Sequence, residues 1–231
     1  AFNGRNDENS VWIRDGLCRL AANVLFVEDS RWPNMFHPRV QAYNALVFEA
    51  LTSEERQAFM TIYNDYFYER HNEMWGALAY RKLSMVLERT NMLVTAEDLG
   101  VLPDCVQPTL DALRILTLEV QTLPKQHGLE FAHLEANPYL SVATISTHDM
   151  PPLRLWWQER PEAAQHYYMD RMQKEGRPPV DLTTTLAEEI VSRHLYSPSM
   201  LCLLSLQDWL AVDAEMRNPD PRSERINIPG D

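Results

Sequence analysis

The sequence has 231 residues, of which 45% are hydrophobic, enough for one sizeable buried core or at most two small ones. Its 33 acidic and 21 basic residues give a formal charge of −12, so it repels phosphate backbones and nucleic acid is not an expected ligand. No apolar run is long enough to cross a membrane. The first residues, AFNGRNDENS, contain neither a start methionine nor a signal-like pattern. We therefore expect a cytoplasmic protein with no membrane partner, cut from a longer chain.

The three cysteines are odd in number, widely spaced along the chain and surrounded by apolar residues. They are Cys18, Cys105 and Cys202. Such a set is more typical of buried, reduced thiols in the cytoplasm than of a disulfide or a metal site. We therefore expect all three side chains to be buried and unpaired.

The first part of the chain is mostly helical in pattern. Apolar residues at helical spacing predict a helix over 10–21, and residues 23–28 (NVLFVE) predict a short strand. Thr52 and Glu55 have the spacing of a capping box, in which each side chain satisfies a free backbone N–H of the first helical turn. From there to about residue 89 there is no proline and one glycine, which predicts a long helical stretch. It is rich in aromatic residues: Phe59, Tyr63, Tyr66, Phe67, Tyr68, Trp75 and Tyr80. We expect these to pack in a core between helices, with a sugar-stacking platform as the alternative.

After residue 91, short apolar runs alternate with helical segments. The runs that predict strands are 92–95, 116–121, 141–146 and 200–206. The helical patterns between them cover about 103–113, 151–160, 161–175 and 181–195. Apolar strands that alternate with helices are typical of a parallel sheet buried on both faces. The sequence therefore predicts a mostly helical segment over 1–90 and an α/β domain over 91–231, with at least one of Trp156 and Trp157 in its core.

All four predicted strands end in polar residues. Those at or just beyond the ends are Glu97 and Asp98, then Gln121, then His148 and Asp149, then Gln207 and Asp208. Ligands of parallel α/β folds bind beyond the carboxyl ends of the strands, so these groups are expected at one edge of the sheet.

Three interpretations of these acids remain open. Asp98 and Asp208, taken singly, also suit the capping of the following helix. Two well-separated acids that face one cleft suit acid/base chemistry on a glycosidic bond. A metal site made by Glu97, His148 and Asp149 is a competitor, but the sequence has no His-x-x-x-His or Cys-x-x-Cys spacing to support it.

Four stretches carry a resemblance to a known family. The segments AEDLGVLPDCV, STHDMPPLRLWW, LQDWLAV and RINIPGD, in this order, resemble the 4-α-glucanotransferase (amylomaltase, disproportionating enzyme) family of glycoside hydrolases. The resemblance is closest to the branch related to the plant cytosolic disproportionating enzyme, which carries a helical insertion in its catalytic domain. It implies the C-terminal half, strands five to eight, of a (β/α)₈ TIM barrel. Residues 1–90 would then be the insertion and its connection.

The resemblance also implies roles for individual residues. Glu97 matches the general acid/base, Asp149 the transition-state stabiliser, and His148 the histidine that contacts the sugar. We expect the remaining substrate contacts from three residues: Gln121, Asp98 and Asn227. The family reaction is a retaining double displacement that moves α-1,4-glucan segments between maltooligosaccharides, with no cofactor and no metal. Retention requires the acid and the nucleophile to lie only about 5 Å apart.

One part of the family pattern is absent. The family nucleophile is an Asp in an Arg-x-Asp-His motif, and no such motif occurs in these 231 residues. Arg14-Asp15 has no following His and lies in a helical pattern. We therefore expect the isolated chain to be inactive and to need the missing N-terminal half of the barrel. We also expect it to self-associate, because its sheet has unpaired strand edges. The alternative function is a non-catalytic glycan-binding or interaction module.

Overall fold

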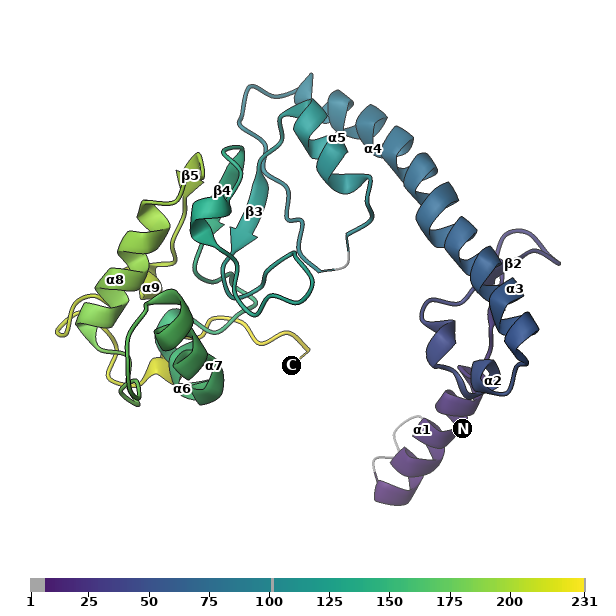
Figure 1. The fold of residues 1–231 in the computed structure, drawn as a ribbon, viewed down its shortest axis with the longest axis horizontal. Coiled ribbons are helices and arrows are strands. Elements are labelled where there is room, and N and C mark those ends of the chain that lie inside the picture. Colours follow the sequence, from purple (N-terminus) through teal and green to yellow (C-terminus); the bar gives the residue numbers. More distant parts are fainter. Residues whose placement is uncertain (1–6, 101, 231) are drawn as a thin grey trace. The chain divides into compact units, whose positions relative to one another are not determined.

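The computed structural model describes residues 7–100 and 102–230, and Figure 1 shows its course. Residue contacts divide the chain into two compact units. The first is Ala1–Leu78 with Pro103–Cys105, and the second is Ala79–Leu102 with Val106–Asp231. In the described part of the chain, no helix combines the length and apolar character that crossing a membrane requires.

The first unit contains short helices and one small hairpin. Its elements are α1 (Glu8–Ala21), β1 (Phe26–Glu28), β2 (Phe36–Pro38), α2 (Leu46–Glu49) and α3 (Ser53–Asn64). The strands β1 and β2 pair antiparallel. The predicted capping box is confirmed: the Thr52 side chain accepts from the Glu55 backbone N–H, and the Glu55 carboxylate accepts from the Thr52 N–H at 2.9 Å. The predicted strand over 23–28 is present only over its second half.

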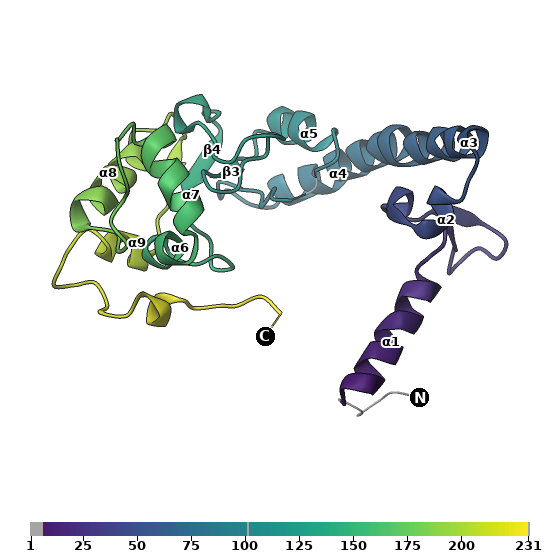
Figure 2. The ribbon, with the colours of Figure 1, turned by 60° about the horizontal axis from the view of Figure 1, so that its bottom comes forward.

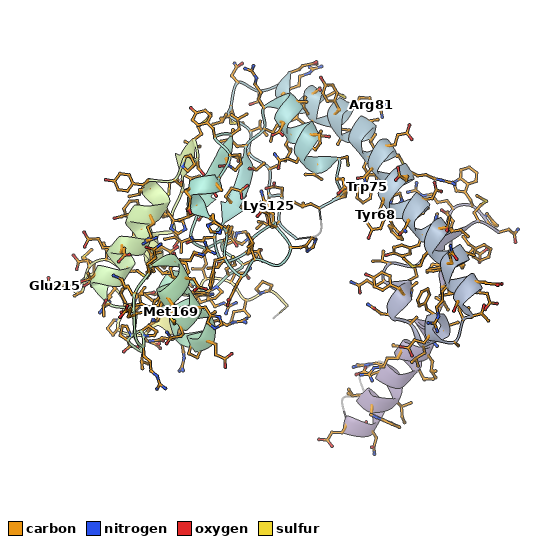
Figure 3. The ribbon with its side chains drawn as sticks, viewed as in Figure 1. Tyr68, Trp75, Arg81, Lys125, Met169 and Glu215 are labelled. Atoms are coloured by element: carbon orange, nitrogen blue, oxygen red, sulfur yellow. The ribbon has the colours of Figure 1, made fainter. Side chains whose placement is uncertain are left out.

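The predicted long helical stretch is confirmed, in three contiguous segments. After α3, a π-helical segment, Asp65–Arg70, leads into α4 (His71–Leu87). The expectation that its aromatic residues are core residues is only partly right. Phe59 and Tyr63 are buried beside Ala42, whereas Tyr68, Trp75 and Tyr80 are exposed (the first two are labelled in Figure 3). A small core covers one face of so long a helix, so aromatic residues on the other faces stay in solvent.

The second unit is built on a parallel sheet. Its strands are β3 (Thr117–Val120), β4 (Ser141–Thr144) and β5 (Leu201–Cys202), in that order. β3 pairs in parallel with β4, and β4 in parallel with β5, as the sequence predicts. A single parallel bridge between Thr95 and Leu116 continues the sheet beyond β3. All four residues of β4 are buried.

Two of the predicted strands are much shorter than expected. Residues 92–95 form only the bridge at Thr95, and Met92 and Leu93 are exposed. In the run 200–206, only Leu201 and Cys202 pair, because Ser205 caps a new helix and ends the extended segment. An apolar run predicts an extended segment, but it does not show where a side-chain cap starts a helix and ends the strand.

Several helices accompany the sheet in the second unit. They are α5 (Val106–Leu113), α6 (Leu153–Glu159), α7 (Pro161–His166), α8 (Thr184–Leu195) and α9 (Leu206–Leu210). The helices α6 to α9 gather beside β4 in both ribbon views (Figures 1 and 2). Their core includes Trp157, Tyr167 and Ile190, and Trp156 packs partly buried against it, so the prediction that one of the two tryptophans is a core residue is confirmed.

The expectation of three buried cysteines is wrong. Cys18 is exposed on α1, and Cys105 and Cys202 are half-buried. In the described part of the chain, none of the three forms a disulfide. Burial raises the pKa of the Cys202 thiol. The apolar neighbours of Cys18 in sequence lie on other faces of a helix that has no buried residue.

Candidate active site

The turn after β4 carries His148 and Asp149 into solvent. The Asp149 side chain is 44% exposed, and its Oδ2 lies 3.4 Å from His148 Nε2. Its other oxygen, Oδ1, accepts a hydrogen bond of 2.5 Å from the Asn227 side-chain amide. Asn227 lies 78 residues further along the chain, so this carboxylate is oriented by groups from two distant segments.

A cavity of about 290 Å³ opens next to this turn, at the carboxyl ends of β4 and β5. Its wall comes from three segments: the end of β4 with the turn that follows, the residues between β5 and α9, and the C-terminal segment. The lining residues are Thr144, Ser146, Thr147, His148, Met150, Pro152, Leu203, Leu204, Ser205, Gln207, Glu224 and Ile226. Polar groups next to apolar walls at this edge suit a ligand that has both hydroxyl groups and apolar faces.

A buried ion pair holds the C-terminal segment in place. Arg154 of α6 lies 2.6 Å from Glu224, and the same Arg154 nitrogen donates to the carbonyl of Asn218 at 2.7 Å. The Arg154 and Glu224 side chains are only 10% and 6% exposed. This pair fixes the segment three residues before Asn227, which brings the Asn227 amide to Asp149.

The sequence predicts Asp208 at the end of a strand, but the structure places it in the interior of the second unit. It lies in α9, fully buried, where Oδ1 accepts from the Leu153 backbone N–H and Oδ2 from the Ser146 hydroxyl, both at 2.8 Å. Burial raises its pKa, and these hydrogen bonds oppose that rise. Ser205 caps α9, and Asp208 instead binds the first turn of α6. Of these two neighbouring residues, Gln207 lines the cavity and Asp208 does not.

Gln121 directly follows β3 and points into the core. Its Oε1 accepts from the Tyr167 hydroxyl at 2.5 Å, and its Nε2 donates to the carbonyl of Ala132 at 3.2 Å. Burial raises the pKa of Tyr167 well above its usual value, so the phenol stays protonated as the donor. Both ends of the Gln121 amide therefore have protein partners.

Glu97 and Asp98 follow the bridge at Thr95 but have opposite environments. Glu97 is exposed. Asp98 is 4% exposed, and its two oxygens accept from the Leu118 backbone N–H at 2.8 Å and from Lys125 Nζ at 2.6 Å. Lys125 lies in the loop after β3 (Figure 3).

The parallel order of the sheet relates these groups. The Thr95 bridge, β3 and β4 run in the same direction, so their carboxyl ends meet at one edge. Glu97, Gln121 and Asp149 follow these ends in turn. Among the described residues, no three His, Cys, Asp or Glu side chains are grouped so that they could hold a metal ion.

Comparison with known proteins assigns the family. Residues 12–231 match the sequence profile of the 4-alpha-glucanotransferases. The chain belongs to this family. Over 230 residues it is 30% identical to the 4-alpha-glucanotransferase DPE2 of Oryza sativa subsp. japonica, an alignment that covers 97% of this chain and 24% of that protein. It is 31% identical over 154 residues to the 4-alpha-glucanotransferase of Chlamydia muridarum, with 64% of this chain and 28% of that protein covered.

A solved structure of the family is also similar. The amylomaltase from Streptococcus agalactiae in complex with acarbose aligns with a TM-score of 0.46 and 17% identity, over 67% of this chain and 28% of that chain. The match of residues 12–231 to the family profile confirms the family predicted from the four sequence stretches. This chain of the 4-alpha-glucanotransferase family spans about a quarter of the length of the curated relatives named here.

Several residues that build the site were not found by sequence reasoning. These residues are Lys125, Arg154 and Glu224, and nothing in the spacing of the charged residues predicts the ion pairs Lys125–Asp98 and Arg154–Glu224. Their partners lie 27 and 70 residues away along the chain. Only the fold brings these groups together.

Proposed function

We propose that this chain forms the acid/base side of the catalytic centre of a retaining 4-α-glucanotransferase. Membership of the family supports this, and the observation that carries it is the pair of carboxylates, Glu97 and Asp149, that follow parallel segments of one sheet. The sheet would be strands five to eight of a (β/α)₈ barrel, with residues 1–90 as a helical insertion. The substrates would be maltooligosaccharides or a related α-glucan.

Each carboxylate has a role in the proposed reaction. Glu97 is exposed and follows the sheet edge, so it can reach a glycosidic oxygen and donate the proton that the leaving group needs. It would then act as base and take the proton from the 4-hydroxyl of the acceptor glucan. Asp149, oriented by Asn227 and close to His148, would stabilise the positive charge that develops at the anomeric centre.

The proposal needs a nucleophile from outside the printed sequence. The Arg-x-Asp-His motif does not occur in it, so an Asp carried by another part of the complete transferase would attack the anomeric carbon. The bond to the leaving glucan breaks as the bond to this Asp forms, and the acceptor hydroxyl later displaces the Asp. It follows that the 231-residue chain alone should release no glucose from maltotriose.

The test compares two donors in the complete transferase that contains this chain. Glu97→Gln removes the transferable proton, so turnover of maltotriose should fall by about 100- to 10,000-fold. α-Glucosyl fluoride needs no protonation of its leaving group, so the first release of fluoride should be retained. Glu215→Gln is the matched control, because Glu215 is exposed in the same unit (Figure 3). Equal losses with both donors would refute the acid role of Glu97.

A further inference from the structure

The hydrogen-bond ladder beside Glu97 ends in a side chain. Leu116 N donates to the carbonyl of Val94 at 3.0 Å, as in a regular parallel pair. Leu118, two residues on, presents its N–H to the same side, but there it meets Asp98 Oδ1 at 2.8 Å. The carboxylate of Asp98 thus replaces a backbone acceptor at the point where the chain leaves the sheet. This fixes the backbone directly after Glu97.

Lys125 holds this carboxylate from the opposite side. Its Nζ lies 2.6 Å from Asp98 Oδ2 and 2.7 Å from Glu119 Oε1. The three side chains are only 19%, 3% and 15% exposed, in the order Lys125, Asp98, Glu119. Glu119 Oε1 also accepts from the Thr117 hydroxyl at 3.0 Å, which anchors the group to β3.

The charges explain why the cation matters. Two carboxylates share one ammonium group in a place with little access to water. Removal of the cation leaves two buried negative charges next to each other, which favours a rearrangement that moves one of them into solvent. If Asp98 moves, its bond to Leu118 is lost, and with it the anchor of Glu97.

We propose that Lys125, acting through Asp98, is a positioning residue for the acid/base Glu97. The inference rests on the proposed function. It replaces the sugar contact expected of Asp98 with a role inside the protein, since both Asp98 oxygens already accept hydrogen bonds. Lys125 touches neither the substrate nor the reacting atoms in this scheme. Its contribution is the orientation of the residue next to its partner.

The experiment uses the complete transferase and two variants. Lys125→Met keeps the length of the side chain and removes its charge, and the resulting displacement of Glu97 should lower kcat for maltotriose by about 10- to 100-fold. Lys125→Met combined with Glu119→Gln leaves one carboxylate in place of two and removes the repulsion between them, so it should recover much of the maltotriose rate that Lys125→Met loses. The first release of fluoride from α-glucosyl fluoride should stay within about threefold of wild type in both.

Two controls separate positioning from general damage. Lys125→Arg keeps a cation between the two acids and should restore most of the maltotriose rate. Lys174→Met breaks a more exposed ion pair, that of Lys174 with Glu189 of α8, and should change the rate with neither donor. If Lys125→Met slows both donors equally, or slows neither, the positioning role is overturned and the proposed function stands. A wild-type protein that transfers no glucose from maltotriose overturns the proposed function and this inference with it.

Discussion

The side-chain amide of Asn227 donates a hydrogen bond of 2.5 Å to Asp149 Oδ1. This bond joins the turn after β4 to a segment near the end of the described chain. The contact is exposed, so its geometry depends on what holds the two segments. The Arg154–Glu224 pair anchors one of them, and Asp208 anchors the other through Ser146 and Leu153. The orientation of the Asp149 carboxylate therefore depends on buried polar contacts that hold the two segments in place.

The first prediction concerns this bond. Asn227→Ala in the complete transferase should lower the rate of transfer from maltotriose by about 10- to 100-fold, because a hydrogen bond to a charged group contributes roughly 1.5 to 3 kcal/mol. Asn227→Asp should be worse, since it places a second negative charge beside Asp149. Steady-state kinetics measure both, and Asn91→Ala, at an exposed residue with no such contact, is the control. If the Asn227→Ala enzyme keeps the wild-type rate, Asn227 does not contribute to the reaction through Asp149.

The second prediction concerns the anchor. Arg154→Met leaves Glu224 buried without its cation, and Glu224 Oε2 already has no hydrogen-bond partner. The free energy of unfolding should fall by about 3 to 5 kcal/mol, which urea denaturation measures. The double variant Arg154→Met with Glu224→Gln removes the unpaired charge and should recover much of this loss. A double variant no more stable than Arg154→Met would mean that charge is not the cause.

The third prediction concerns the core of the second unit. Trp157 is 2% exposed, and its indole N–H donates to the carbonyl of Pro179 at 3.0 Å, whereas Trp156 packs partly buried against the same core. Trp157→Ala should cost about 3 to 5 kcal/mol of stability. Trp156→Ala should cost clearly less, because its ring gives up less buried surface. Thermal denaturation of the two variants decides the order, and a larger loss at Trp156 would contradict it.

The parts of the fold that the sequence predicts well depend on short-range patterns. The Thr52–Glu55 capping box, the long helix after it and the parallel strands β3 and β4 all follow from residues close together in the chain. The errors depend on long-range contacts. Asp208 fits a strand end by its position, but its carboxylate finds partners 55 and 62 residues away, on Leu153 and Ser146. No local pattern contains that information.

The residues of the candidate site show the same difference between short-range patterns and long-range contacts. The family motifs make Glu97, His148 and Asp149 candidates, because the stretches that contain these residues resemble the family pattern and occur in its order. Lys125 is absent from any motif that the sequence presents, and only the approach of the loop after β3 to Asp98 reveals it. The polar groups that orient a site come from several segments, so they are the last to be predictable from sequence.

The last prediction concerns pH. His194 of α8 is 1% exposed, its Nδ1 is bonded to the carbonyl of Ile190 at 2.8 Å, and its Nε2 is buried without a partner. Burial lowers the pKa of His194 from 6.5 to about 4, so the folded protein keeps the ring neutral. Between these pH values the unfolded chain binds a proton that the folded chain does not. Stability from this group is therefore complete above pH 6.5 and is lost on acidification towards pH 4, by at most about 3 kcal/mol.

The variant His194→Phe isolates this contribution, because phenylalanine fills a similar volume and cannot bind a proton. Asp208 has a pKa raised by burial, so it contributes in the opposite direction on acidification, but it is present in both proteins and cancels in the comparison. Unfolding free energies measured from pH 7 to pH 4 should fall less steeply for His194→Phe than for wild type. His127→Phe, at an exposed histidine, should follow the wild-type curve. Parallel curves for His194→Phe and wild type would show that the buried ring does not control acid stability.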